Sequence, residues 1–388
     1  MNILYASTLN LSIEKGDSLH FAQLAAALQR RGHRITVVAR GWRAYDSFRP
    51  LNARLIPRLP GSRWFPQLND ALLQKVLTAY LQLGKFDILY HRGIPGANRL
   101  ARQHAIPSIV EVNGIKTDEL RLETGNMQWI DYHRHREAQI VRDANKVICV
   151  TKGIRDQLIQ RYAVLPEKCV VIPNAADTHI FSPMPKQECR KKLGVPSDAY
   201  HIGFVGTFQH WIDFETLLQA LAVLARSSLP VRCTLIGNGQ KLSDVLVRTQ
   251  ELKLQSQIHF AGRVPHENIP CWVNAFDVCV APFTRLRNEQ IGISPLKLFE
   301  YMACERPVVA TELPGISGVI RNADAGLLYA AENPKDLAAQ LRALYANSDL
   351  ARKFGRNGRN YVAENHSWDR VAEQIEAVMH NTINETRH

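Results

Sequence analysis

Strand-like and helix-like segments alternate along most of this chain. Runs rich in β-branched and other apolar residues predict strands at 3–6, 35–39, 86–90, 108–112, 146–150 and 170–172. Apolar residues spaced by three or four positions predict helices between them, at 19–31, 97–104, 131–143 and 153–162. Strands that alternate with helices form parallel sheets covered on both faces, so the sequence predicts an α/β fold.

A second run of the same kind follows a proline-rich break. Pro183, Pro185 and Pro196 predict a linker over 182–198. After it we expect strands at 201–205, 231–236, 258–260, 278–281 and 308–310, and helices at 214–225, 242–252 and 296–304. We therefore predict two doubly wound, Rossmann-like domains facing a cleft, at 1–178 and 183–366. A C-terminal helix at 367–388 is expected to pack back on the first domain.

Three features of the sequence bear on location. The N-terminus lacks a basic region followed by a long apolar run, so we expect no signal peptide. No stretch approaches the ~20 apolar residues of a membrane-spanning helix. The seven cysteines are scattered and form no C-x-x-C pair, which disfavours structural zinc and a disulfide framework. We expect a cytoplasmic protein that can also bind peripherally to the inner face of the membrane.

Two glycine-containing loops suggest different ligands. Gly16 and Asp17 precede the first helix, where unpaired N–H groups attract anions. A plain surface turn capped by Ser18 is the alternative for this loop. Gly237-Asn238-Gly239 lacks the third glycine of a dinucleotide fingerprint, which disfavours an NAD-dependent oxidoreductase.

The most informative segment runs from Gly292 to Ala310. A polar, glycine-containing loop opens a helix, and the helix leads into a β-branched strand. The N–H groups at the helix start can hold a phosphate, and Lys297 near the first turn would add positive charge. Glu300 follows three residues later on the same helix face. The alternative is an ordinary Lys–Glu pair on the surface of an amphipathic helix.

This segment resembles the donor-site signature of the retaining GT-B glycosyltransferases of family 4 (glycosyl transferases group 1). Four further stretches resemble motifs of that family and stand in the family's order. They are the crossing between the domains at 172–177, the glycine loop at 203–208, a strand and turn at 235–239, and the loop over the base at 260–264. The resemblance reaches from the N-terminal β-loop-α unit to 367–371 and so covers almost the whole chain.

The resemblance implies that the second domain binds a nucleotide-sugar. Glu300 matches the second glutamate of the family's E-x(7)-E motif and would accept hydrogen bonds from the ribose hydroxyls. Backbone amides near Ser294, together with Lys297, would face the diphosphate, and Gly206 would let the backbone approach it. The donor-binding residues so implied are Gly206, Thr207, Arg263, Val264, Gly292, Ile293, Ser294, Leu296, Lys297 and Glu300, and the catalytic residues are Asn113, Lys297 and Glu300.

Two positions depart from the side chains of the family pattern, and the first departure removes a carboxylate contact to the donor sugar. Gly292 stands where the first glutamate of E-x(7)-E is expected, and whether Glu289 replaces it stays open. Asn113 aligns with a histidine that many members carry in the first domain.

A third departure concerns charge. Thr207 and Ile212 stand where the family often has two basic residues, so other groups would have to balance the negative charge of the phosphates. The candidates are backbone N–H groups and the side chains of Arg263, Arg287 and Lys297. A subgroup with the same Ser-Pro-Leu-Lys helix start is similar in these respects, so we interpret the departures as a variant active site.

The first domain would hold the acceptor, near Gly16, Asp17, His20 and Glu111. The family mechanism is a front-face transfer that retains the anomeric configuration, with the acceptor proton passing to the departing phosphate. His20 could act as a base, although a histidine on a helix is more often structural. No Asp-x-Asp motif stands in a convincing place, so we expect no metal and no other cofactor.

The expected acceptor is a glycan or a lipid-linked molecule, as in the synthesis of cell-surface polysaccharides or glycolipids. A GT-B nucleotide-sugar epimerase and a non-catalytic scaffold of the same fold stay open as alternatives. The sequence pI of about 9.5 raises the possibility of nucleic-acid binding, but no nucleic-acid motif supports it.

The positive charge is concentrated in the first half of the chain. The formal net charge is +12, and residues 1–180 hold 25 Lys and Arg against 15 Asp and Glu. Nine arginines and one acid, Asp46, lie between Arg30 and Arg63. Trp42, Tyr45, Phe48, Trp64 and Phe65 lie among or beside them. A solvated basic face would explain this stretch, but basic side chains and aromatics also bind anionic membranes, at about 1 kcal/mol per Lys or Arg. Because the family's acceptor is often lipid-linked, we interpret residues 30–65 as a membrane-binding patch.

Overall fold

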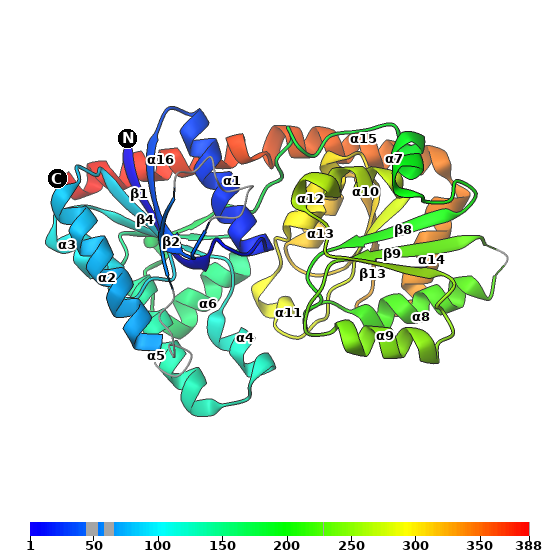
Figure 1. Ribbon diagram of the computed structural model, residues 1–388, viewed down its shortest axis with the longest axis horizontal. Helices are drawn as coiled ribbons and strands as arrows, with labels where there is room; N and C mark the ends of the chain where they lie inside the picture. The colour runs from blue at the N-terminus through cyan, green and yellow to red at the C-terminus, as the bar shows by residue number, and fades with distance from the viewer. Residues whose placement is uncertain (44–52, 58–65, 228, 388) are drawn as a thin grey trace. The chain divides into compact units, whose positions relative to one another are not determined.

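Parallel β-sheets organise both parts of the computed structural model, which describes residues 1–43, 53–57, 66–227 and 229–387 (Figure 1). Unit 1 contains Met1–Pro173 and Trp368–His388, and unit 2 contains Asn174–Ser367. The first unit ends at Pro173, whereas the sequence predicted an end at 178, and the backbone N–H of Asn174 already donates to Ser294 Oγ of unit 2 at 2.9 Å.

The described strands of unit 1 run parallel in the order β3-β2-β1-β4-β5-β6-β7. Their bounds are β1 (Asn2–Asn10), β2 (Arg34–Arg40), β3 (Arg54–Ile56), β4 (Ile88–Arg92), β5 (Ser108–Val112), β6 (Lys146–Cys149) and β7 (Cys169–Val171). Every residue of β5 is buried, and only the last residue of β4 is partly exposed. Helices cover such strands on both faces, which is why they read as continuous apolar runs.

The helices of unit 1 form two groups around this sheet (Figure 1). Helix α1 (Gly16–Arg30) packs on α16 (Trp368–Arg387). On the other side, α2 packs on α3, α3 on α5 and α5 on both α4 and α6. The bounds of this group are α2 (Pro66–Leu83), α3 (Ala97–Gln103), α4 (Lys116–Glu123), α5 (Met127–Asp143) and α6 (Lys152–Tyr162), followed by the 3-10 turn η2 (Pro166–Lys168). Leu73, Leu77 and Leu81 of α2 recur every four residues and are buried against the sheet.

Unit 2 repeats the plan with its described strands in the parallel order β10-β9-β8-β11-β12-β13. Their bounds are β8 (Tyr200–Val205), β9 (Val231–Ile236), β10 (Ile258–Gly262), β11 (Val278–Ala281), β12 (Val308–Thr311) and β13 (Gly326–Tyr329). The apolar side chains of these strands and of the surrounding helices form one continuous buried cluster. Each unit is therefore a doubly wound α/β layer structure with its own core.

The helices of unit 2 also fall into two groups. Helix α8 packs on α9 and α14, whereas α7 packs on α10, and α12 on α15 (Figure 1). The bounds are α7 (Lys186–Leu193), α8 (Phe214–Ala225), α9 (Leu242–Glu251), α10 (Ile269–Ala275), α11 (Asn288–Ile291), α12 (Leu296–Ala303), α13 (Ile316–Ala323), α14 (Pro334–Ala346) and α15 (Ser348–Asn365), with the 3-10 turn η3 (His266–Asn268).

The prediction of a linker over 182–198 is wrong, because this stretch contains helix α7. Pro185 precedes the first helical residue, where a missing N–H costs nothing, and Gly194 ends the helix in a left-handed conformation at φ +65°. The helix is short and highly charged, yet Cys189 and Arg190 are buried against unit 2. A short polar helix with prolines on both sides has the same composition as a linker, which is why the sequence predicted one here.

The strand order places a switch point in each sheet. In unit 2, β8 pairs with β9 on one side and β11 on the other, so the connections after β8 and β11 leave in opposite directions. Unit 1 has the same reversal between β1 and β4. In open α/β sheets, ligands bind outside the carboxyl ends of the strands at such a point. These two edges are therefore where candidate sites are to be sought.

Two further expectations concern the chain as a whole. No helix among the described residues combines the length and apolarity needed to cross a membrane. All seven cysteines belong to the described part of the chain, and each is a free thiol.

Candidate active site

Lys297 lies at the switch point of unit 2. It is the second residue of α12, and its ammonium sits over the ring of Phe204 in β8, 4.0 Å from the ring centroid. The ring of Phe283, which follows β11, lies on another side at 5.6 Å. Two aromatic rings from the strands that flank the switch point thus hold this cation by cation–π contact.

The charge on Lys297 has no counter-anion in the described structure. No carboxylate among the described residues lies within ion-pairing distance of it, and Glu300, one helical turn away, only acts at longer range. Burial lowers the pKa of Lys297 to about 7, and the Glu300 charge offsets only part of that effect. The surface Lys–Glu pair considered as an alternative is therefore not what forms. An anion placed here would complete the site.

Gly206 provides the space that Lys297 occupies. It follows β8 with φ +149°, and a Cβ at this position would lie 2.3 Å from the Lys297 ammonium nitrogen. The neighbouring turn is equally tight, because a Cβ on Gly237 would lie 1.9 Å from the carbonyl oxygen of Gly206. The glycines bring two loops and the lysine together at the carboxyl end of β8.

Helix α12 is fixed to the sheet by a residue that the sequence did not single out. The Tyr301 hydroxyl accepts from the backbone N–H of Val205 at 2.7 Å and lies 3.2 Å from the carbonyl oxygen of the same residue. Glu300, the preceding residue, is 7% exposed and lies 3.5 Å from the ring nitrogen Nε2 of His266. Tyr301 therefore sets where Lys297 and Glu300 stand relative to the end of β8.

Some polar groups of the loop before α12 form hydrogen bonds within unit 2 and are not free to bind a ligand. The N–H of Ile293 donates to the carbonyl oxygen of Pro314 at 2.9 Å, and Ser294 Oγ accepts from Asn174. Gly292 turns the chain at φ +67° after α11. Two groups expected to contact the diphosphate, the Ile293 amide and one lone pair of the Ser294 hydroxyl, are thus already hydrogen-bonded within the protein. The helix that starts at Leu296 still has the unpaired first-turn amides of any helix N-terminus.

The remaining donor-side candidates lie at or near the surface. Thr207 and Arg263 are exposed, and Val264 is half-buried against the core of unit 2. Glu289 is exposed on α11, and the guanidinium of Arg287 lies over the Trp211 ring at 4.8 Å. Arg263 follows β10, whose loop is tied to the glycine turn by the Gly237 N–H donating to the Gly262 carbonyl oxygen at 2.8 Å. All of them belong to unit 2, as Lys297 does.

In unit 1, Glu111 is the centre of a buried polar network at the carboxyl end of β5. Its Oε2 accepts from the Tyr90 hydroxyl at 2.5 Å, and its Oε1 lies 2.7 Å from His20 Nε2 and 3.5 Å from Arg92 Nε. Burial alone would raise the pKa of Glu111, but His20, Arg92 and the Tyr90 hydrogen bond lower it to about 2. The carboxylate is therefore ionised although it is only 4% exposed.

An ionised Glu111 determines the tautomer of His20. The short contact places the His20 proton on Nε2, so Nδ1 is left with a lone pair toward Asn113 Nδ2 at 3.3 Å. The amide oxygen of Asn113 is buried and has no hydrogen-bond partner in the described structure. His20 thus orients Asn113, and both of its ring nitrogens are engaged. Tyr90, Arg92 and Trp368, whose ring lies 4.8 Å from that of His20, were not predicted.

Gly16 and Asp17 begin α1, which starts before the predicted position 19. Both are exposed, and the Asp17 carbonyl oxygen accepts from Arg92 Nη1 at 2.9 Å. Ser18 is not the cap: it is buried in the first turn, and its hydroxyl oxygen accepts from the Lys15 N–H at 2.9 Å. Gly16, Asp17, His20, Glu111 and Asn113 all belong to unit 1, and the Arg92 side chain contacts both the helix start and Glu111.

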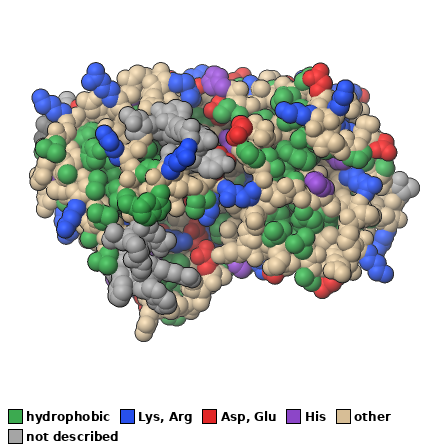
Figure 2. All heavy atoms as spheres, viewed as in Figure 1, with side chains coloured by type: hydrophobic (Ala, Val, Ile, Leu, Met, Phe, Trp, Pro, Cys, Tyr) green, Lys and Arg blue, Asp and Glu red, His purple; other side chains and the backbone are tan. Residues whose placement is uncertain are grey.

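No group of three or more His, Cys, Asp or Glu in the described ranges has the arrangement of a metal site. The cations of the basic stretch 30–65 are partly engaged within unit 1. Arg30 pairs with Asp369 at 2.8 Å, and Arg40 with Asp70 at 2.8 Å. Figure 2 shows Lys and Arg side chains dispersed among hydrophobic and uncharged atoms on the described surface in view. The part of this prediction at 44–52 and 58–65 lies outside the described residues.

Two family models match the chain, one for each unit. Residues 16–180 match the model described as Glycosyltransferase Family 4, and residues 185–361 match the model described as Glycosyl transferases group 1. The D-inositol 3-phosphate glycosyltransferase of Actinosynnema mirum is 26% identical over 392 residues, covering 93% of this chain and 90% of that protein. The enzyme of the same name from Thermobispora bispora is 26% identical over 313 residues, covering 77% and 72%.

Solved structures share the fold over nearly the full length. Anabaena HepE in complex with UDP-glucose superposes with a TM-score of 0.76 and 17% identity, covering 98% of this chain and 100% of that one. A glycosyltransferase from Rickettsia africae gives a TM-score of 0.72 and 18% identity, covering 98% of each chain.

Proposed function

This chain belongs to the group 1, family 4 glycosyltransferases and has the GT-B fold, and from that premise we propose how its residues divide the reaction. Unit 2 binds a nucleotide-sugar, and unit 1 binds a glycan or lipid-linked acceptor. The transfer retains the anomeric configuration and serves the synthesis of a cell-surface polysaccharide or glycolipid. HepE, which shares the fold, was solved with UDP-glucose, which supports a nucleotide-sugar as donor.

Lys297 carries the proposal. Its ammonium is held over Phe204 at the start of α12 and beside Gly206, with no carboxylate partner among the described residues. A diphosphate would supply the missing negative charge and would receive N–H groups from the helix start. As the glycosidic bond breaks, negative charge builds up on the leaving diphosphate. A preorganised cation and amides stabilise that charge more in the transition state than in the ground state.

Glu300 and the glycine at 292 define the rest of the donor site. Glu300 is nearly buried with His266 beside it, so its carboxylate is well placed to accept hydrogen bonds from a ribose diol. Gly292 offers no side chain to the sugar. Arg263, Val264 and Thr207 complete the site at its exposed side.

In unit 1, Asn113 contacts the acceptor, and the His20–Glu111 pair orients it. His20 is not the base of the reaction, because its Nε2 faces Glu111 and its Nδ1 faces Asn113. The acceptor proton passes instead to a phosphate oxygen of the leaving group. The helix start at Gly16 and Asp17 lies against the same Arg92 side chain and completes the acceptor side.

We also propose that transfer needs no metal ion, since Lys297 and the helix amides offset the diphosphate charge. Activity should persist in excess EDTA, and its complete loss there would refute this point.

The stretch 30–65 is proposed to bring unit 1 to an anionic membrane. Trp42 is 76% exposed and stands next to the exposed Arg43, an aromatic–basic pair suited to the interface. Co-sedimentation should rise with the fraction of anionic lipid and fall in Trp42→Ala and Arg43→Gln proteins. Equal sedimentation with neutral and anionic vesicles would contradict the proposal.

The experiment that tests the whole proposal is a donor screen across UDP-, GDP- and ADP-sugars, with cell lipid extract as acceptor source. Nucleotide release that requires acceptor, with a product of unchanged anomeric configuration, is the expected result. Conversion of a donor without acceptor would indicate an epimerase, and binding of no nucleotide would indicate a scaffold.

A further inference from the structure

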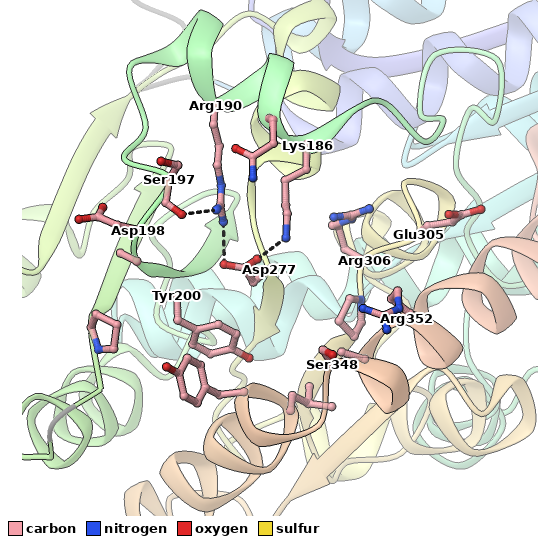
Figure 3. Close-up of a pocket in the computed structure, with 17 residues that line it drawn as sticks. Lys186, Arg190, Ser197, Asp198, Tyr200, Asp277, Glu305, Arg306, Ser348 and Arg352 are labelled. Atoms are coloured by element: carbon pink, nitrogen blue, oxygen red, sulfur yellow. Dashed lines mark hydrogen bonds and ion pairs between the residues drawn. The ribbon is translucent and has the colours of Figure 1, made fainter.

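A depression lies on the surface of unit 2 (Figure 3). It is at the opposite edge of the sheet from Lys297. It opens at the amino ends of β8, β11 and β12, where Tyr200, Asp277 and Pro307 line it. Its volume of about 440 Å³ lies within the range of small-molecule sites. Because the strands are parallel, this edge is remote from the carboxyl ends that position Gly206, Lys297 and Glu300.

The acid at the centre of the depression is already neutralised. Asp277 accepts from Lys186 at 2.7 Å, from Arg190 at 2.6 Å and from the backbone N–H of His201 at 2.8 Å. Burial would raise the pKa of Asp277, but these partners hold it below its usual value. Two cations around one carboxylate leave one positive charge in excess, and Lys186 is the more exposed of the two.

Arg306 adds a cation without a carboxylate partner. Its Nε donates to the carbonyl oxygen of Cys304 at 3.1 Å, and its Nη1 donates to that of Phe276 at 3.3 Å. No ion pair joins it to any acid among the described residues. Backbone carbonyls thus fix a half-buried guanidinium on the lining and leave its charge uncompensated, which is the state that a bound anion would relieve.

The far side of the depression supplies a helix start and an aromatic surface. Ser348, the first residue of α15, lines it together with Arg352, and Figure 3 shows both beside Arg306. Tyr345 is 41% exposed and meets Tyr200 edge-on at 5.2 Å. The Tyr200 hydroxyl is buried and has no hydrogen-bond partner in the described structure.

The lining also contains groups that oppose an anion. Asp198 is exposed and Glu305 is half-buried, and Asp349 in the first turn of α15 pairs with Arg352 and neutralises its charge. The positive side of the depression is therefore local, formed by Arg306, Lys186 and the amides at the very start of α15, since the Leu350 N–H already donates to the Asn347 side chain at 2.9 Å. A ligand with one compact anionic group and an uncharged ring matches this distribution better than a polyanion.

We propose that this depression is a second ligand site, which binds a small organic phosphate. The phosphate would take hydrogen bonds from Arg306 and Lys186 and lie at the N-terminus of α15, and the attached ring would lie against Tyr345. A mononucleotide and a sugar phosphate share this chemistry. Neither the donor site nor the acceptor side uses any of these residues.

Equilibrium dialysis with labelled AMP, glucose 6-phosphate and inorganic phosphate tests the site and separates the two sources. At least one organic probe should bind, and binding should weaken tenfold or more in Arg306→Gln and in Ser348→Asp proteins. An aspartate at the first position stabilises a helix, so Ser348→Asp repels the anion without a loss of folding. Tyr345→Ala should weaken the organic probe and leave inorganic phosphate unchanged.

Two control variants keep the result specific. Lys297→Met removes the donor-site cation, and Arg226→Gln removes an exposed arginine elsewhere in unit 2; both should leave this binding unchanged. The proposal is overturned if neither organic probe binds, if Ser348→Asp and Arg306→Gln bind like the parent protein, or if Lys297→Met abolishes binding. Inorganic phosphate bound as tightly as both organic probes would overturn the assignment to an organic phosphate.

Discussion

At the scale of the residue, the protein holds two charges away from bulk water, with Lys297 half-buried and Glu111 buried, and each is held for a different reason. The Lys297 ammonium contacts two aromatic rings and has no anionic partner in the part of the chain that the structure describes. The Glu111 carboxylate is surrounded by donors from strand β4 and helix α1. Lys297 therefore has a charge that a bound anion would balance. Glu111 already has its hydrogen-bond and charge partners, and it orients the side chains around it.

The lowered pKa of Lys297 predicts that nucleotide binding takes up a proton. With a pKa of about 7, most of the free protein carries a neutral lysine at pH 8.5, and a bound diphosphate would raise that pKa again. Titration calorimetry of UDP or GDP in buffers of different ionisation enthalpy should show uptake approaching one proton. Lys297→Met protein should show none, and a buffer-independent heat in the parent protein would refute the account.

The same shift has a defined sign for stability. Because the folded pKa lies below the unfolded value near 10.5, the unfolded chain binds more protons between about pH 7 and pH 10.5. The contribution of Lys297 to stability therefore rises across this window and is fully unfavourable below pH 7.

Glu111→Gln should impair catalysis more than donor binding. The amide has no charge to balance Arg92 and can present an N–H to His20 Nε2, so the His20 tautomer and the Asn113 orientation are lost, together with about 3 kcal/mol of stability. We expect kcat to fall tenfold or more with little change in the KM for the donor. The exposed Glu123→Gln is the matched control. In the parent protein, the stabilisation by Glu111 should be lost as pH falls from about 4.5 through about 2.

At the scale of the element, the sequence predicted where the helices and strands of the site begin and end, but it did not predict which side chains contact each other. Helix α12 was expected at 296–304 and is observed at Leu296–Ala303, and β8, β11 and β12 also lie within one residue of their predicted ends. Apolar runs and helix starts are encoded by neighbouring residues, so they can be predicted from a single sequence. Helix α7 was missed because its polar composition and flanking prolines carry no such periodicity.

Contacts between elements were not predictable in the same way. Tyr90 and Glu111 are separated by 21 residues, and His20 and Asn113 by 93. Only the strand order β1-β4-β5 brings them together. The Tyr301 hydroxyl reaches Val205 across 96 residues, and nothing in the local pattern distinguishes it from an ordinary core tyrosine.

Tyr301→Phe tests whether α12 is anchored by this hydroxyl. The change leaves the buried N–H of Val205 without its acceptor, which should cost about 1–3 kcal/mol of unfolding free energy. Because α12 would then shift relative to β8, the KM for the donor should rise as well. Urea denaturation and donor kinetics measure the two effects. Loss of stability with unchanged donor kinetics would limit Tyr301 to a structural role.

At the scale of the whole molecule, the last helix belongs to the first unit. Helix α15 lies in unit 2, and the chain leaves that unit at Ser367 so that α16 packs on α1. Arg30 and Arg31 at the C-terminal end of α1 pair with Asp369 and Glu376 of α16, respectively. Part of the positive charge in the first half of the chain is thus matched by acids at the end of the chain, which the charge count of residues 1–180 could not show.

Met379→Ala should destabilise unit 1 alone. Met379 is fully buried on α16, so its truncation should cost about 2–5 kcal/mol in the unfolding of unit 1. Binding of nucleotide by unit 2 should stay unchanged. Denaturation followed by hydrogen exchange in α1 and α8 separates the two units, with the exposed Met184→Ala as control. Equal loss of protection in both helices would contradict the assignment of α16.

Lys297 is proposed to stabilise the leaving diphosphate, and the most direct test is the rate of glycosyl transfer in Lys297→Met protein. With the donor found in the screen, kcat/KM should fall a hundredfold or more, as expected when one preorganised group at the developing charge is removed. Lys335→Met, which removes an exposed lysine of α14, should transfer at the parent rate. Transfer by Lys297→Met at a rate close to that of the parent protein would contradict the account.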